Sequence, residues 1–155
     1  MLCPRLHHFL DERESHYTTL HHERTETAAQ TAEAVQAARD QFAKTVMLRV
    51  DGVMAMLVMP ATYHADLHRL RLALGGAEVE LAREDEFRDV FSDCEPGAMP
   101  PFGNLYGVPV YLDSRLCERE AIVFNAGTHT DAVRMPYAEF EALVKPEVLW
   151  LVHMM

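Results

Sequence analysis

The sequence predicts a single α/β (α+β) domain spanning residues 1–155. The clearest signal is a β-hairpin, because the apolar runs 42–50 and 53–59 flank Asp51-Gly52, a pair typical of a two-residue hairpin turn. A second strand pair is predicted at 122–134, where an apolar run passes into small and polar residues and back again. A chain of this length can bury one substantial core, and no stretch of it resembles a long linker.

The third observation is a strand, helix, strand passage after the hairpin. Residues 53–59 are apolar on both faces, which predicts a central, covered strand that Pro60 ends. Leu67, Leu70 and Leu74 then have helical spacing, and the helix is expected to end at Gly75-Gly76 before residues 77–82 return to strand. Strands interspersed with helices place the chain in the α/β (α+β) class.

The remaining elements follow from shorter patterns. We expect, in chain order, a helix carrying Leu6, Phe9 and Leu10; a strand over 16–20; a helix from a Thr27–Gln30 capping box to Ala38; a helix over 84–91; a strand over 108–112; a turn over 113–118; and a helix after Met135 carrying Phe140, Leu143 and Val144. The apolar tail 148–152 is expected to pack on the body of the protein or on a partner.

The charge balance restricts the partners. The chain has 14 Lys and Arg against 24 Asp and Glu, and its net charge of -10 argues against a protein that coats DNA or RNA nonspecifically. A small pocket for one nucleotide remains compatible with this charge. No stretch approaches the roughly 20 apolar residues that span a membrane, and the N-terminus lacks a signal-peptide core, so we expect a cytoplasmic protein without a membrane partner.

Cysteine and histidine usage predicts no metal site, no cofactor and no disulfide. Cys3, Cys94 and Cys117 are odd in number and have no Cys-x-x-Cys spacing, which favours free thiols. The neighbouring pairs His7-His8 and His21-His22 would point apart on a helix or strand.

One lysine is predicted on an apolar face. Strand alternation puts Lys44 on the same side as Phe42, Val46, Leu48 and Val50. A buried ammonium group is costly unless it is paired or opens into a cleft. Lys44 is therefore either a functional cation or a residue whose stem is buried while its charged end reaches water.

Two loops have the composition of pocket walls. Residues 94–107 contain three prolines and three glycines, which stiffen the path and oppose regular structure, with Met99 and Phe102 at the centre. In 122–134, Gly127 is followed by Thr128, His129 and Thr130, which supply two hydroxyls and an imidazole at a strand end. The alternatives are a packed surface loop and a turn whose side chains satisfy its own backbone.

Several enzyme classes are excluded by motif. The chain has no Walker loop, no Rossmann glycine fingerprint and no nucleophile elbow. A Cys94 nucleophile with His129 as its base remains formally possible, but nothing in the sequence brings the two together.

Three motifs, taken in order, resemble one family: Phe-Ala-Lys-Thr-Val-Met-Leu around Lys44, Gly-Ala-Met-Pro-Pro-Phe-Gly at 97–103, and Phe-Asn-Ala-Gly-Thr-His-Thr at 124–130. From about residue 17 to residue 144 the chain is similar to the YbaK/EbsC family, which is related to the editing domain inserted in bacterial prolyl-tRNA synthetases. The resemblance implies a mixed, mostly antiparallel sheet flanked by helices. It also implies hydrolysis of the ester between a wrongly attached small amino acid and the end of a tRNA.

The resemblance carries site residues with it. Lys44, Gly127 and His129 match the positions of the family's functional lysine and glycine-x-histidine pair, and we expect them to be catalytic. Substrate binding is expected from the glycine-to-proline loop and the last motif, through Gly97, Pro101, Phe102, Gly103, Asn125, Thr128 and Thr130. In related enzymes a ribose hydroxyl helps to activate or position water, while the protein orients the ester and steadies the oxyanion with backbone N–H groups, so no side-chain nucleophile is expected.

One departure concerns the turn before the lysine. Many relatives have a glycine there, whereas residues 36–42 contain none. The accepted amino acid and tRNA are therefore left open. If only the tRNA end enters the pocket, Arg49, Arg69 or Arg71 are candidates for contacts with the RNA backbone.

The sequence thus predicts an aminoacyl-tRNA deacylase that acts in trans on the aminoacylated 3′ adenosine, with a synthetase as a possible further partner. The alternative is a noncatalytic module that binds a nucleotide or aminoacyl end, or that docks on another protein through the tail 148–152.

Overall fold

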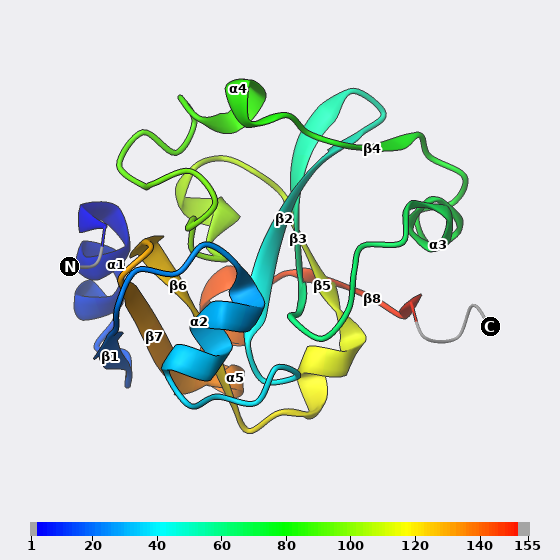
Figure 1. The fold of residues 1–155 in the computed structure, drawn as a ribbon. Coiled ribbons are helices and arrows are strands. Elements are labelled where there is room, and N and C mark those ends of the chain that lie inside the picture. Colours follow the sequence, from blue (N-terminus) through cyan, green and yellow to red (C-terminus); the bar gives the residue numbers. More distant parts are fainter. Residues whose placement is uncertain (1–2, 152–155) are drawn as a thin grey trace.

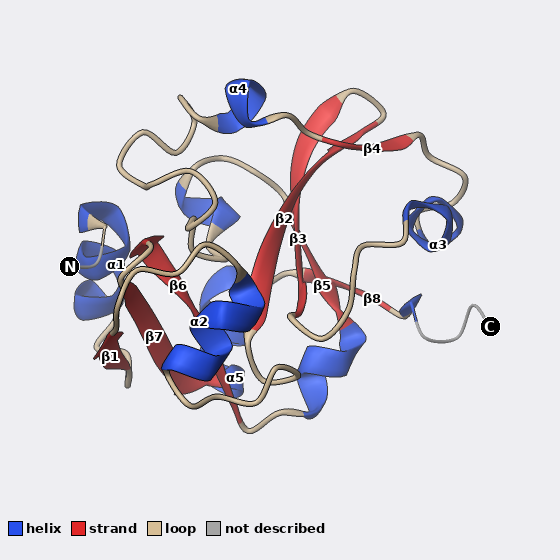
Figure 2. Cartoon of the chain, in the orientation of Figure 1, coloured by secondary structure: helices blue, strands red, loops and turns tan. Residues whose placement is uncertain are grey.

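Residues 3–151 of the computed structural model form two β-sheets with helices packed around them (Figure 1). The larger sheet contains, in spatial order, β4 (Val79–Leu81), β2 (Ala43–Val50), β3 (Val53–Pro60), β5 (Val110–Asp113) and β8 (Glu147–Leu149). The smaller sheet contains β1 (Thr18–His21), β7 (Asp131–Pro136) and β6 (Ala121–Thr128). The helices are α1 (Pro4–Glu12), α2 (Ala28–Ala34), α3 (Leu67–Ala73), α4 (Glu84–Phe87) and α5 (Tyr137–Val144), and Figure 2 shows them around the two sheets.

The predicted fold class is confirmed. Pairing is antiparallel throughout the smaller sheet and between β2 and its two neighbours, whereas β3, β5 and β8 run parallel. The strands therefore form a mixed, mostly antiparallel arrangement, divided into two sheets. The sheets meet at a single parallel bridge between Phe42 and Val123, where the Val123 N–H also donates to the Gln41 carbonyl at 3.2 Å.

The predicted hairpin is present, with Val50 opposite Val53 and a two-residue turn between them. Asp51 and Gly52 have φ values of 50° and 82°, and turns with two positive φ angles match the twist of the flanking strands. β3 is central in its sheet, as expected, although Pro60 is its last residue rather than the residue after it.

Helix α2 begins as the sequence predicts and ends earlier. Thr27 accepts from the Gln30 N–H while the Gln30 side chain returns to the Thr27 N–H, which is a complete capping box. The helix ends at Ala34 rather than Ala38, because Gln36 adopts a φ of 58°. The Gln36 and Ala37 N–H groups then donate to the carbonyls of Glu33 and Ala32, which is a Schellman termination.

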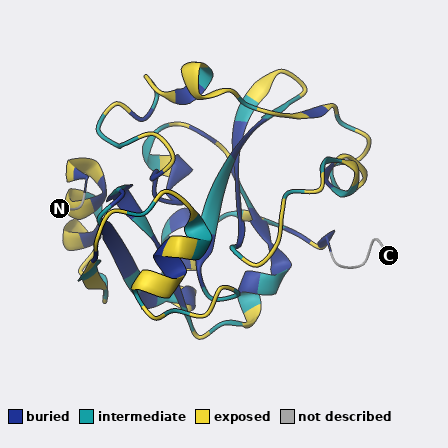
Figure 3. Ribbon diagram, viewed as in Figure 1, coloured by how far each residue is buried: buried dark blue, intermediate teal, exposed yellow. Residues whose placement is uncertain are grey.

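The core lies between the sheets and under the helices. Figure 3 shows buried residues along the strands and exposed residues on the outer side of α2. The main cluster joins α1, α5 and the facing sides of both sheets, and includes Leu6, Met47, Phe102, Phe124 and Phe140. A second cluster lies under α3 and a third under α2, where Ala32 meets Phe42 and Val123.

Two expectations are corrected. The helix over 84–91 is limited to the short α4, and the loop over 94–107 contains a 3₁₀ turn at Gly103–Leu105. The apolar tail packs on the body of the protein, as one of the two expectations had it, because β8 pairs with β5 and Leu151 is buried. Trp150 is 60% exposed, and residue 152 lies outside the described residues. Between residues 3 and 151, no helix is long and apolar enough to cross a membrane.

Candidate functional site

The glycine-proline loop is seated on the turn between β6 and β7. The Glu95 N–H donates to the Gly127 carbonyl at 2.7 Å, and the Gly127 N–H donates to the Ala98 carbonyl at 2.9 Å. These two bonds hold the loop against the end of β6 as an extra strand would be held. The structure therefore brings together the second and third motifs, which are separate in the sequence.

His129 fixes the same loop through its ring and its backbone. Its Nε2 atom lies 2.9 Å from the Pro96 carbonyl oxygen, and a Cβ placed on Gly97 would lie 3.5 Å from its Cε1. Its backbone N–H donates to Glu95 Oε1 at 2.8 Å, and this bond is the main reason that the pKa of Glu95 lies below its ordinary value. His129 is only 7% exposed, so its ring is a packed part of the loop and turn together.

The segment after β1 holds the turn from its other side. The His22 N–H donates to the Thr130 carbonyl at 2.9 Å, and the Thr25 N–H donates to the His129 carbonyl at 3.1 Å. Arg24 completes the connection with an ion pair to Glu95 at 3.2 Å. We refer to residues 95–98 with 127–130 as the loop–turn unit.

The hydroxyls of the turn are directed at a buried carboxylate. Thr128 Oγ1 donates to Asp131 Oδ2 at 2.6 Å, and Thr130 Oγ1 donates to the same atom at 3.2 Å. Burial opposes ionisation of Asp131, but hydrogen bonds that include those from Thr128 and His21 keep the pKa of this carboxyl below its ordinary value. In this conformation the two hydroxyls stabilise the turn.

Lys44 lies on the β2 face that the sequence predicts. It is paired with Met59 across the hairpin and shares its side of the strand with Val46 and Leu48, which pack under α3. Burial lowers the pKa of Lys44, and no ion pair with an acidic group is present for it within residues 3–151. The ammonium group is therefore partly desolvated and has no compensating carboxylate among the described residues. This is the costly arrangement that the sequence predicts for a lysine on an apolar face.

Strand β2, which contains Lys44, is joined to the glycine-proline loop and to β6, both of which lead into the loop–turn unit. Thr45 Oγ1 donates to the Met99 carbonyl at 3.2 Å. At the Phe42–Val123 bridge β2 lies beside β6, so Lys44 and the half-buried Asn125 each follow the bridge by the same step along parallel strands. The structure thus places Lys44 and Asn125 on one side of this junction, and within residues 3–151 no hydrogen bond or ion pair links the Lys44 side chain to the loop–turn unit.

Three predicted loop residues are in the core. Phe102 has no exposed surface, and its ring centroid lies 5.5 Å from those of Phe124 and Phe140. A Cβ on Gly103 would lie 2.7 Å from the Val108 carbonyl oxygen, so this glycine allows close packing of the backbone. Pro101 is also buried. In this conformation the three residues support the loop from beneath.

Gly127 is required because its backbone lies against Cys3, a contact that the sequence does not predict. Its φ is 98°, and an added Cβ would lie 2.5 Å from the Cβ of Cys3, the N-cap residue of α1. The Cys3 N–H also donates to the Ala126 carbonyl at 2.9 Å. Cys3 thus fills the space beside the Gly127 backbone. The roles of Cys3, Glu95 and Asp131 had no sequence signal beyond residue type.

The Cys94–His129 pair is not formed. Cys94 Sγ lies beside Tyr106 and Asp93, whereas the His129 ring is committed to Pro96. A hydrogen bond with Cys3 and burial raise the pKa of Cys94, which disfavours the thiolate that a nucleophile needs.

The three arginines suggested for RNA contact have partners within the protein. Arg49 pairs with Glu80 at 2.7 Å and with Glu86 at 3.1 Å, and Arg69 pairs with Asp66 at 3.5 Å. Arg71 donates to the Val79 carbonyl at 2.9 Å.

The structure has cavities elsewhere. One of about 540 Å³ is lined by polar residues that include Asp40, Glu118, Arg119 and Arg134. Another, of about 450 Å³, lies next to it between β1 and the outer ends of β6 and β7. Neither is lined by Lys44 or by the loop–turn unit.

Solved structures share this fold. A putative trans-editing enzyme for prolyl-tRNA synthetase superposes with a TM-score of 0.82 at 24% identity, covering 96% of each chain. A hypothetical protein gives a TM-score of 0.82 at 18% identity, covering 93% of this chain and 96% of its own. A putative signal transduction protein from Marinobacter aquaeolei gives 0.73 at 19% identity, covering 96% of this chain but 30% of its own. At these identities the likeness establishes the fold, and a search of curated proteins found no match.

The sequence itself matches a family model over residues 22–143, which contain Lys44 and the whole loop–turn unit. The matched range lies within the stretch that we compared with the YbaK/EbsC family, so that resemblance is confirmed. The chain belongs to the aminoacyl-tRNA editing domain family.

Proposed function

We propose that this protein is a deacylase that acts in trans on aminoacyl-tRNA, hydrolysing the ester between a small mischarged amino acid and the terminal adenosine. The observation that carries the proposal is the loop–turn unit, in which Gly97 is held on His129 near the strand of Lys44, a half-buried lysine with no acidic partner among residues 3–151. The family membership supplies the class of reaction, and the geometry supplies the roles below.

Lys44 is proposed to bind a phosphate or ribose oxygen of the terminal adenosine. Its ammonium group has no acidic partner in the described part of the chain, so an anionic ligand would not have to displace one. Partial burial strengthens such a pair, because charges interact more strongly outside bulk water. The overall charge of -10 confines this attraction to the tRNA end rather than to a broad RNA surface.

Gly97 is the strongest candidate for a backbone donor to the ester. The N–H groups of Gly127 and His129 are already donated to Ala98 and Glu95. The exposed Gly97 N–H lies 3.3 Å from the Met99 sulfur, which is a weak acceptor that a carbonyl oxygen or oxyanion can replace. A preorganised donor of this kind contributes about 2.7–4 kcal/mol to an acyl-transfer barrier.

His129 is proposed to position the substrate rather than to act as the general base. In the neutral ring, donation from Nε2–H to the Pro96 carbonyl leaves Nδ1 as an acceptor. That atom can accept a hydrogen bond from a ribose hydroxyl or from the amino group of the aminoacyl moiety. The bond to Pro96 also keeps the ring from turning.

The reaction proposed is hydrolysis assisted by the substrate. A water molecule, oriented by the free hydroxyl of the terminal ribose, attacks the ester carbonyl carbon. The bond between that carbon and the ribose oxygen breaks, and the ribose oxygen takes up a proton as it leaves. The protein contributes binding, orientation and the Gly97 donor, which is consistent with a site that has no nucleophile beside a base.

The test is a panel of tRNAs charged with Ala, Ser, Thr or Cys, and the panel should include the proline tRNA because of the trans-editing neighbour. We expect ester loss above the buffer rate with at least one small amino acid, and Lys44→Ala should lower kcat/KM. Lys145→Ala is the matched control, because Lys145 is the only other lysine and is exposed.

Two outcomes count against the proposal. No ester loss with any charged tRNA at high protein concentration would exclude the deacylase. Tight binding of an aminoacylated end without turnover, weakened by Lys44→Ala, would instead establish the noncatalytic binding module.

A further inference from the structure

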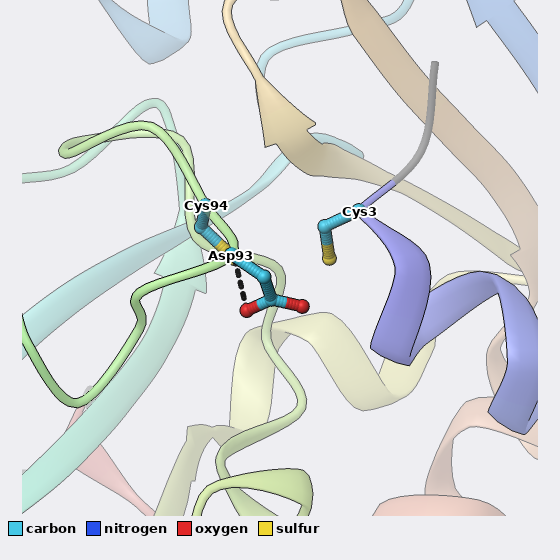
Figure 4. Close-up of side chains that lie close together, drawn as sticks. All are labelled: Cys3, Asp93 and Cys94. Atoms are coloured by element: carbon cyan, nitrogen blue, oxygen red, sulfur yellow. Dashed lines mark hydrogen bonds between the residues drawn. The ribbon is translucent and has the colours of Figure 1, made fainter.

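A second cluster of reactive side chains lies behind the loop–turn unit. Figure 4 shows the side chains of Cys3, Asp93 and Cys94 directed at one another. Cys3 comes from the start of α1, and Asp93 and Cys94 come from the start of the glycine-proline loop. Their two sulfur atoms and a carboxylate oxygen all lie within 4.8 Å of one another. The function proposed above uses none of the three.

We propose that Cys3, Cys94 and Asp93 bind a thiophilic divalent cation of the zinc class. The donor set identifies the class of ion, since thiolates select zinc-like cations whereas magnesium and calcium prefer oxygen ligands alone. The inference is independent of the proposed deacylase activity.

The distances fit a tetrahedral site after a small movement. Zn–S bonds of about 2.3 Å place two thiolate ligands about 3.8 Å apart at a tetrahedral centre. The two sulfurs and the carboxylate oxygen lie within 4.8 Å of one another, so the sulfurs are at most about 1 Å farther apart than this spacing. The ion would form bonds to both sulfurs and to one Asp93 oxygen, and the thiol protons would be released to solvent.

Tyr106 already organises the cluster. Its hydroxyl donates to Asp93 Oδ1 at 2.7 Å, and its oxygen lies 3.4 Å from Cys94 Sγ and 3.8 Å from Cys3 Sγ. Hydrogen bonds of this kind orient ligating carboxylates in metal sites. The hydroxyl is therefore near all three proposed ligands.

Arg5 provides the second support. The backbone N–H of Arg5 donates to Asp93 Oδ2 at 3.4 Å. The Cζ atom of its guanidinium lies 4.7 Å from the centroid of the Tyr106 ring. Two thiolates and a carboxylate around a divalent ion leave a net negative charge, which this neighbouring cation offsets.

The site would connect α1 to the loop–turn unit. Cys3 is packed against Gly127, and Cys94 immediately precedes Glu95, whose N–H and carboxylate hold the turn. A bound ion would therefore cross-link the N-cap of α1 to the base of this unit and stabilise the folded protein.

The test is titration of the reduced, metal-free full chain with Co²⁺, followed by Zn²⁺, in a reductant that does not bind metals. We expect one Co²⁺ per chain, with a thiolate-to-cobalt charge-transfer band and the visible bands of tetrahedral Co²⁺, and both should disappear when Zn²⁺ is added. Zn²⁺ should also raise Tm and protect two of the three thiols from a disulfide reagent.

The variants locate the ion. Cys3→Ser and Cys94→Ser should each abolish the charge-transfer band of the stoichiometric complex, and Asp93→Asn should weaken Co²⁺ affinity at least tenfold. Cys117→Ser is the control, because Cys117 contacts Tyr137 and lies outside the cluster. Far-ultraviolet circular dichroism establishes that each variant is folded.

Three results would overturn the inference: no thiolate band in the folded wild type, a band that Cys3→Ser and Cys94→Ser leave unchanged, or a band that Cys117→Ser removes. A Cys3–Cys94 disulfide formed on oxidation, together with no cobalt binding by the reduced protein, would identify the cluster as a redox pair instead.

Discussion

The Nε2 atom of His129 lies 2.9 Å from the carbonyl oxygen of Pro96, and this contact joins the turn between β6 and β7 to the glycine-proline loop. A histidine in a polar turn is usually considered first as an acid or base. Here one ring nitrogen is used to hold the loop that contains Gly97. The loop and the turn are therefore a single structural unit, and perturbing the ring should affect both.

Replacing His129 by Ala should loosen the loop before it unfolds the protein. Loss of a packed, hydrogen-bonded ring should lower the free energy of unfolding by about 1–3 kcal/mol. Deacylation should fall by about 10²-fold, as expected when positioning is lost by about 1 Å. Hydrogen exchange should become faster at the Glu95 and Ala98 amides, which is a readout independent of activity.

The control for this variant is His8→Ala, which removes a histidine side chain that is 76% exposed on α1. It should leave loop exchange and activity unchanged. If His129→Ala lowers activity while the exchange of the loop amides stays at the wild-type rate, the ring acts on the substrate and not on the loop.

Gly127→Ala should destabilise the protein more than its backbone angle alone explains. A side chain at a φ of 98° is strained, and its Cβ would lie 2.5 Å from the Cβ of Cys3. Strain and overlap together predict a loss of about 2–5 kcal/mol in the free energy of unfolding. Urea unfolding measures this loss.

Gly107→Ala separates the two contributions. Gly107 also has a positive φ, of 70°, but nothing lies within 4 Å of an added Cβ. Strain alone should cost about 1–2 kcal/mol there. Equal losses in the two variants would show that α1 moves away from Gly127 easily and that the Cys3 contact is not rigid.

Local sequence signals were sufficient for most elements. Asp51-Gly52 has the positive φ angles of its turn type, and Thr27 with Gln30 forms the predicted capping box, because both depend on residues a few positions apart. The position of Lys44 on an apolar face also follows from simple alternation. These features are determined by local geometry, which sequence periodicity reports directly.

Contacts between distant segments could not be predicted in this way. Nothing in residues 94–107 indicates that Phe102 turns into the core while Gly97 remains exposed. Cys3 and Cys94 have no ligand spacing, since their proximity depends on α1 packing against the end of β6. The sequence predicts an apolar tail over 148–152 and no strand there, because the three residues of β8 are too few for a periodic signal.

Gln36→Gly should stabilise the protein. Gln36 has a φ of 58° at the Schellman end of α2, where glycine is the preferred residue. The change relieves about 1–2 kcal/mol of backbone strain in the folded protein, but glycine gives the unfolded chain more freedom, which costs about 0.4–1 kcal/mol. The free energy of unfolding should therefore rise by about 0.5–1 kcal/mol. Thermal unfolding should show a higher Tm.

The control is Ala34→Gly, in the last turn of the same helix. It should cost about 0.5–1 kcal/mol, because glycine there gains no strain relief and increases the freedom of the unfolded chain. A Gln36→Gly variant that is less stable than wild type would mean that the Gln36 side chain makes a compensating contribution.

Lys44→Met should increase stability at neutral pH, even though the proposed function requires the lysine. Burial lowers the pKa of Lys44 below its ordinary value of 10.5, so the folded protein bears a cost for keeping the ammonium charged. Between the lowered pKa and 10.5 the unfolded chain binds more protons than the folded one, and wild-type stability must rise with pH through that window. The advantage of Lys44→Met should therefore be greatest near pH 7 and shrink as the pH approaches 10.5.

Urea unfolding at both ends of this range measures the difference in stability between Lys44→Met and the wild type. The control is Lys145→Met, at an exposed lysine, which should show no such trend. An advantage of Lys44→Met that stays constant over the range would mean that the ammonium is fully solvated, and the same result would remove the physical reason for assigning this lysine to a substrate anion.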